Sequence, residues 1–73
     1  MSSRTKGSNE QRTVKNALLA AGGTIEASCW SEVRKGLNLQ MNTANVQATV
    51  KALCGRGDIK HTVMPGSFVL VLT

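Results

Sequence analysis

Few side chains in this sequence could act as nucleophiles or metal ligands. It contains two cysteines, Cys29 and Cys54, one histidine, His61, and four acidic residues. It has no Cys-x-x-Cys or His-x-x-x-His pair, which are spacings that zinc sites use. Cys54 falls on an apolar stripe and Cys29 precedes Trp30, which predicts packed, unreactive thiols. We therefore expect no enzymatic activity, no bound metal and no cofactor.

Arg56, Gly57 and Asp58 form an Arg-Gly-Asp tripeptide, which many extracellular proteins display to adhesion receptors. The N-terminal stretch MSSRTKGSNEQRT is polar throughout and resembles neither a signal peptide nor a membrane span. A reducing cytosol would keep both cysteines as thiols. We expect a cytoplasmic protein in which the tripeptide joins a helix to a strand and is not displayed as an adhesion loop.

The charge balance favours a polyanionic partner. Nine Lys and Arg residues against four Asp and Glu residues give a net charge of +5 on 73 residues. Such an excess attracts polyanions and releases their counterions on binding, although it could also serve solubility alone. A chain of this length forms one small domain. Because Trp30 and Phe68 are the only aromatic residues, its core must be aliphatic.

The N-terminal residues 1–8 show no apolar periodicity and include Arg4 and Lys6. This composition predicts a flexible basic arm. A single domain over residues 9–73 would follow it.

Three helices are predicted from apolar spacing within this domain. They cover residues 10–21, 29–36 and 42–56, with N-caps at Ser8 or Asn9, at Ser28, and at Asn42 or Thr43. Gly22-Gly23 ends the first helix, and Gly55 or Gly57 ends the third. Gly36 and Asn38 tolerate positive φ and allow a sharp turn before the third helix.

The C-terminal third of the chain predicts a β-hairpin. Two apolar or alternating runs, DIKHTV and SFVLVLT, flank a turn at Met64–Ser67. A further short strand is expected near Thr24-Ile25. The run FVLVLT is apolar on both faces, more than three helices can cover, which favours burial of one side against a second copy or a partner.

This order of elements resembles the winged helix-turn-helix family from about Asn9 to Thr73. The local matches are LLAAGG, WSEVRKGLNL, NTANVQATVKAL and RGDIKHTVMPGSFVLVLT. In the last of these, Leu53, Gly57 and Ile59 fill the frame in which such domains end the recognition helix and open the wing. The resemblance implies an α+β fold of three helices with a C-terminal β-hairpin wing.

The resemblance also implies double-stranded DNA as the partner, with the third helix (Asn42–Arg56) in the major groove. Amides at Asn45 and Gln47 suit base edges, and hydroxyls at Thr43 and Thr49 suit phosphates or a thymine methyl. Ala44 and Ala48 would keep the helix surface low. Phosphate contacts are expected from Arg4, Lys6, Arg34, Lys35, Lys51, Arg56 and Lys60.

Two functions remain open at this point. The first is a transcriptional regulator of bacterial or phage type that binds DNA. The second is a protein–protein interaction module, for dimerisation or for binding a protein of the transcription or replication machinery. The wing tip, Met64–Ser67, carries no Lys or Arg and so departs from many DNA-binding wings. A homodimer through the final strand is a further expectation.

Overall fold

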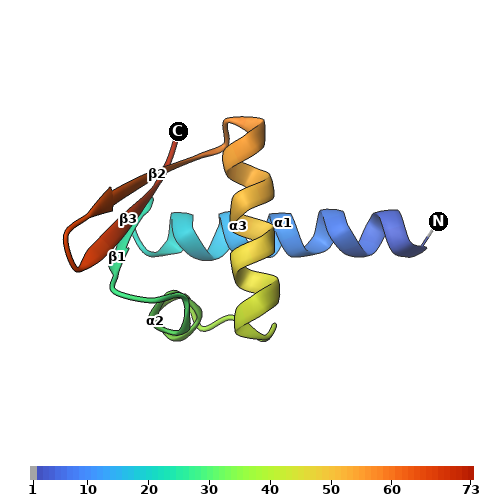
Figure 1. The fold of residues 1–73 in the computed structure, drawn as a ribbon. Coiled ribbons are helices and arrows are strands. Elements are labelled where there is room, and N and C mark those ends of the chain that lie inside the picture. The colour runs from blue at the N-terminus through green and yellow to red at the C-terminus, as the bar shows by residue number, and fades with distance from the viewer. Residues whose placement is uncertain (1) are drawn as a thin grey trace.

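A computed structural model describes residues 2–73, with side chains from residue 9 onward. Within this range the chain forms three helices and one antiparallel sheet of three strands, an α+β fold (Figure 1). The elements are α1 (Ser2–Ala20), β1 (Thr24–Ala27), α2 (Trp30–Gly36), α3 (Thr43–Arg56), β2 (Ile59–Met64) and β3 (Ser67–Leu72). This order agrees with the prediction, and the layout is compatible with a winged-helix arrangement.

The first helix starts earlier than predicted and ends where predicted. α1 begins at Ser2, ahead of the expected cap at Ser8 or Asn9. The side chains of residues 2–8 lie outside the described part of the chain, so the basic arm stays a prediction. At the other end, Gly22 and Gly23 have φ of 98° and 84° and stop the helix. The Gly23 N–H donates to the Leu18 carbonyl at 2.8 Å, which closes the last turn.

The second helix is capped differently from the prediction. Its N-cap position is Cys29 and not Ser28, and the Cys29 side chain makes no capping hydrogen bond. Ser28 instead donates from its backbone N–H and its hydroxyl to Oε1 of Glu32, at 2.9 and 2.8 Å. Glu32 therefore holds the chain at the entrance to α2.

The sheet has the order β1-β3-β2, with every neighbouring pair antiparallel. The predicted hairpin is confirmed as β2 and β3, and the predicted short strand extends to Ala27 and pairs with β3. β3 is therefore the central strand, with both of its hydrogen-bonding edges occupied. On one face, Leu70 lies opposite Ile25 and His61.

The core lies between the helices and that face of the sheet. Its buried apolar residues come from all three helices, all three strands and the turn between α2 and α3: Val14, Leu18, Ala27, Val33, Leu37, Leu39, Val46, Val50, Leu53, Ile59 and Leu70. Apart from Ala27, they are aliphatic residues larger than alanine, as the scarcity of aromatic residues requires.

Three rings extend this core toward the end of the hairpin. Trp30 packs against Phe68 with ring centroids 4.8 Å apart, and His61 lies 5.7 Å from Trp30 and 5.2 Å from Phe68. Trp30 is thus a packing residue at the start of α2. Val63, which pairs with Phe68 on the same face of the sheet as His61, has an exposed side chain.

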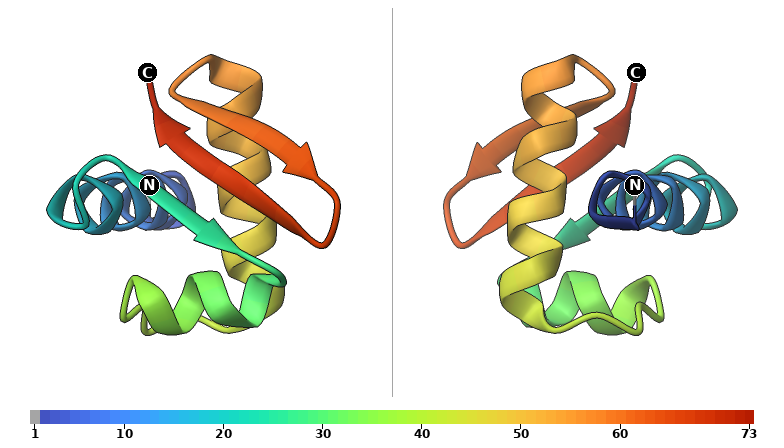
Figure 2. Two further views of the ribbon diagram at one scale, coloured as in Figure 1. Left: turned by 90° about the vertical axis from the view of Figure 1, so that its left-hand side faces the viewer. Right: turned by 90° about the vertical axis from the view of Figure 1, so that its right-hand side faces the viewer.

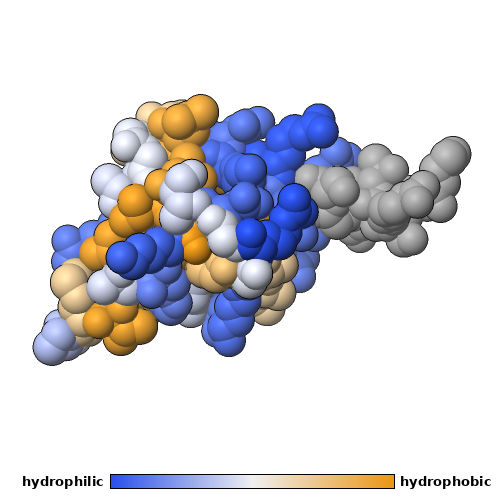
Figure 3. All heavy atoms as spheres, turned by 90° about the horizontal axis from the view of Figure 1, so that it is seen from above, coloured by the Kyte–Doolittle hydropathy of each residue, from blue (hydrophilic) through white to orange (hydrophobic). Residues whose placement is uncertain are grey.

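The opposite face of the sheet points away from the helices. Val69 and Val71 lie on this face, because strand residues alternate between faces and Leu70 between them is buried against the helices. Both valines are half-buried. Figure 3 shows hydrophobic residues gathered over the sheet side of the molecule, while the helical side is mainly hydrophilic in this view. The second apolar face that the sequence predicted therefore consists of a valine pair with polar neighbours.

Candidate nucleic-acid interface

α3 is the element with the clearest local signals at both ends. Oδ1 of Asn42 accepts a hydrogen bond from the backbone N–H of Asn45 at 2.8 Å, so Asn42, one of the two predicted N-caps, begins the helix. At the other end, Gly57 adopts φ of 85°, and the Asp58 N–H donates to the Leu53 carbonyl at 2.9 Å. Gly57, one of the two predicted stops, therefore ends the helix.

The outward face of α3 has a low profile. Val46, Val50 and Leu53 are fully buried, so the residues half a turn away face outward. Ala44, Asn45, Ala48, Lys51 and Ala52 are exposed, while Thr43 and Gln47 are half-buried at the side of the helix. Alanine side chains along the middle allow another molecule to approach the helix backbone closely.

Thr49 does not belong to this exposed set. Its relative exposure is 7%, because it lies three residues after Val46 and four before Leu53 and thus on the buried face. The prediction that Thr49 contacts a phosphate or a base is therefore wrong.

The turn between α2 and α3 is fixed by a side chain that was predicted to contact DNA. The Nε–H of Arg34 donates to the Met41 carbonyl at 2.8 Å, in a partly buried position. Asn38 adopts φ of 52°, as predicted, whereas Gly36 is not in the left-handed region. Gly36 is needed for space instead, since a Cβ there would lie 2.9 Å from Cδ1 of Ile25.

The remaining predicted cations divide into separate groups. Lys35 is exposed at the end of α2, and Lys51 is exposed on α3. Lys60 follows buried Ile59 in β2, so it lies on the sheet face away from the helices and does not join the surface of α3. Arg4 and Lys6 lie outside the residues whose side chains are described.

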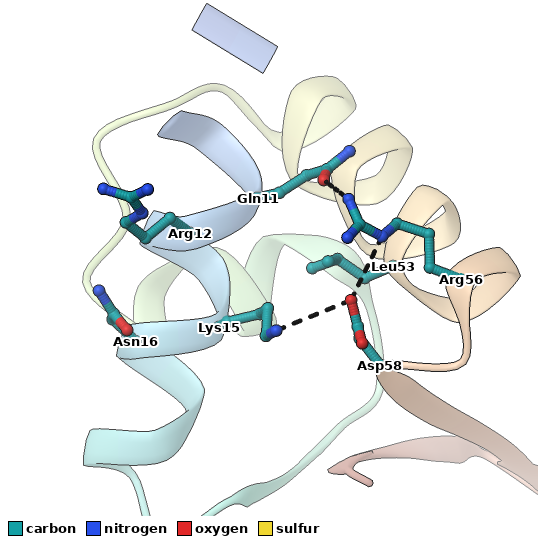
Figure 4. Close-up of a pocket in the computed structure, with 7 residues that line it drawn as sticks. All are labelled: Gln11, Arg12, Lys15, Asn16, Leu53, Arg56 and Asp58. Atoms are coloured by element: carbon teal, nitrogen blue, oxygen red, sulfur yellow. Dashed lines mark hydrogen bonds and ion pairs between the residues drawn. The ribbon is translucent and has the colours of Figure 1, made fainter. Parts of the chain in front are cut away.

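Arg56 takes part in a network that connects α1, α3 and Asp58, the residue before β2. Its Nη1 donates to Oε1 of Gln11 at 2.8 Å, and its Nε lies 3.4 Å from Oδ2 of Asp58. Nζ of Lys15 lies 3.7 Å from the same Asp58 oxygen (Figure 4). The Arg56 side chain remains 63% exposed, so a phosphate can still reach it.

Two further cations, Lys15 within this network and Arg12 near it, were not among the predicted site residues. Both line a surface hollow between α1 and the end of α3, which Arg56 also lines. The spacing of four between Gln11 and Lys15 is a signal that these two share one side of α1, with Arg12 on the neighbouring side (Figure 4). The sequence gives no distance between residues 12–15 and residues 56–58, so it could not place them beside Arg56.

The cysteines differ in their surroundings. Both are free thiols, and burial raises the pKa of Cys54. Cys29 is exposed, so the prediction that it is packed in the core is wrong. Among residues 9–73, no group of three His, Cys, Asp or Glu side chains comes together as a metal site requires.

No helix in the described part of the chain is both long enough and apolar enough to cross a bilayer. Comparison of the chain with protein-family models, curated proteins and solved structures finds no match.

Proposed function

We propose that this chain is a winged-helix DNA-binding protein that acts as a transcriptional regulator, with α3 in the major groove of a duplex. The observation that carries the proposal is the outward face of α3. It combines a low alanine surface with the exposed amide of Asn45 and the cation of Lys51, on a chain of net charge +5. In Figure 2, the β2–β3 turn projects past α3 on the side away from α1, as expected for a wing.

In this proposal, some side chains of α2 and α3 contact bases and others contact phosphates. Asn45 lies near the N-terminal end of the helix, and its amide can donate and accept at the edge of an adenine. Gln47 is half-buried at the side of the helix, so it is less well placed than Asn45 to contact a base. Lys51 and Lys35 contact phosphates, and the capped turn held by Arg34 keeps the angle between α2 and α3 fixed.

The second candidate function is a protein–protein interaction module. It is favoured by the turn between β2 and β3, which carries no cation, and by Glu26, whose carboxylate accepts a hydrogen bond from the Ser67 hydroxyl at 3.2 Å. A carboxylate there repels DNA phosphates. A dimer through β3 would have to use the face carrying Val69 and Val71, because both β3 edges are paired.

A salt series of binding to duplex DNA separates the two functions. A labelled mixture of random duplexes is titrated with the protein, and the dissociation constant is measured by fluorescence anisotropy at several salt concentrations. DNA binding predicts that log K falls linearly with log salt, by roughly 0.9 for each neutralised phosphate. Negligible binding at low salt, or binding without a salt slope, would contradict it.

A further inference from the structure

A basic hollow lies between α1 and the junction of α3 with β2, apart from the outward face of α3. Its volume is about 350 Å³. Figure 4 shows Gln11 and Lys15 pointing from α1 toward Arg56 and Asp58, with Arg12 and Asn16 on the neighbouring side of the helix. Leu53, which is fully buried, forms part of the lining.

The charges in this hollow are unbalanced. Arg12, Lys15 and Arg56 contribute three positive charges and Asp58 one negative charge, so the lining carries a net charge of +2. Arg56 and Lys15 both approach Oδ2 of Asp58, at 3.4 and 3.7 Å. A single carboxylate oxygen therefore serves two cations, at distances longer than those of short charge-assisted hydrogen bonds.

The donors in the hollow also exceed its acceptors. Arg56 uses Nη1 toward Gln11 and Nε toward Asp58, which holds the guanidinium in a fixed orientation and leaves Nη2 available. The ammonium of Lys15 has the Asp58 oxygen as its one ion-pair partner within the described residues. An anion with several acceptor oxygens would satisfy these donors better than the carboxylate can alone.

We propose that this hollow binds a phosphate group, through Arg56 and Lys15 with Arg12 at its rim. A tetrahedral phosphate offers oxygens in several directions, and the arginine fork and the lysine point charge both suit them. The phosphate could be a phosphodiester of bound DNA or the phosphate of a small ligand. The site does not depend on base reading by α3, so it stands or falls separately from the proposed function.

The test follows backbone amide shifts in ¹H–¹⁵N spectra while inorganic phosphate is added at constant ionic strength. We expect saturable shifts confined to residues 11–16 and 53–58. Lys15→Gln should weaken phosphate binding about fivefold, the size expected for one exposed charge contact. Lys60→Gln removes the same charge from the sheet face away from the helices and should leave phosphate binding unchanged. If Lys15→Gln alters the circular dichroism spectrum, Arg12→Gln replaces it.

A parallel titration with duplex DNA identifies the source of the phosphate. Shifts in the same residues, with weaker DNA binding in Lys15→Gln, assign the hollow to the DNA backbone. Shifts with inorganic phosphate and none with DNA assign it to a small phosphorylated ligand. The proposal is overturned if neither titration shifts these residues saturably, or if Lys15→Gln and Lys60→Gln weaken phosphate binding equally.

Discussion

Oδ1 of Asn42 accepts a hydrogen bond from the backbone N–H of Asn45 at 2.8 Å. The bond satisfies one of the N–H groups that have no partner within the first turn of a helix. It also connects the turn after α2 to the part of α3 where Asn45 is exposed. The start of α3 is therefore fixed by a local interaction, before any packing of the helix is considered.

Replacing Asn42 with alanine should destabilise the fold by about 1 kcal/mol, because the cap is lost and no new contact is gained. In a domain of this size, that corresponds to a fall in Tm of roughly 4–8 °C. Thermal unfolding followed by circular dichroism measures it. Asn42→Asp keeps an acceptor in place and should retain most of the stability. Equal losses in the two variants would show that the cap is not the cause.

Gly55 and Gly57 lie two residues apart and should respond to alanine in opposite ways. Gly55 is exposed within α3, and a Cβ there meets nothing within 4 Å, so Gly55→Ala should stabilise the protein by about 0.5–1 kcal/mol. Gly57 has φ of 85°, and Gly57→Ala should destabilise it by about 1 kcal/mol. Urea unfolding measures both. Changes of the same sign would contradict the assignment of Gly57 as the helix stop.

Glu32 should make stability depend on pH in the acidic range. The backbone N–H of Ser28, and then its hydroxyl, hold the pKa of the Glu32 carboxyl below its ordinary value. A pKa lowered in the folded state contributes stability above the ordinary value, and this is lost as pH falls through the folded value. Protonation should therefore weaken the entrance to α2.

Ser28→Ala removes the hydroxyl and keeps the backbone donor. The pKa of Glu32 should therefore rise only part of the way to its ordinary value, which NMR titration of the carboxyl carbon measures. Ser67→Ala, whose hydroxyl contacts Glu26 and not Glu32, serves as the control. A Glu32 titration that is the same in Ser28→Ala and in the unsubstituted protein would disprove the role of the hydroxyl.

Local signals in the sequence were enough to predict most of the fold. The cap at Asn42, the stop at Gly57 and the stripe of Val46, Val50 and Leu53 each depend on residues close together in the chain. The strand at Thr24-Ile25 was predicted as well. Its pairing partner was not, because pairing with β3 joins segments more than forty residues apart.

The candidate site was harder to predict, because long polar side chains form hydrogen bonds with residues that are close only in the folded chain. Arg34 is seven residues from Met41, and its bond depends on the shape of the turn between them. Arg56 finds Gln11 across 45 residues. Thr49 lies beside the apolar stripe, and threonine is compatible with either side of that boundary. Net charge predicts a partner class but not which cations lie together.

Substitutions of Asn45 and Lys51 should weaken DNA binding in different ways if α3 reads DNA, as proposed. Asn45→Ala removes an amide that can distinguish bases, so it should weaken specific binding by about 1–3 kcal/mol and leave non-specific binding nearly unchanged. Lys51→Gln removes a phosphate contact, so it should weaken binding to all sequences alike and reduce the salt slope by roughly one. Neither side chain is buried, so both variants should unfold at the temperature of the unsubstituted protein.

The measurement needs a preferred duplex, which repeated selection from a random pool supplies, and a scrambled duplex of the same length. Anisotropy titrations of both variants on both duplexes give four dissociation constants to compare with the unsubstituted protein. An equal loss of affinity for the two duplexes in Asn45→Ala would show that Asn45 contacts the DNA backbone and not a base. If selection enriches no sequence while Lys51→Gln still lowers the salt slope, α3 binds DNA through charge alone, and readout by Asn45 is excluded because specific binding requires a preferred sequence.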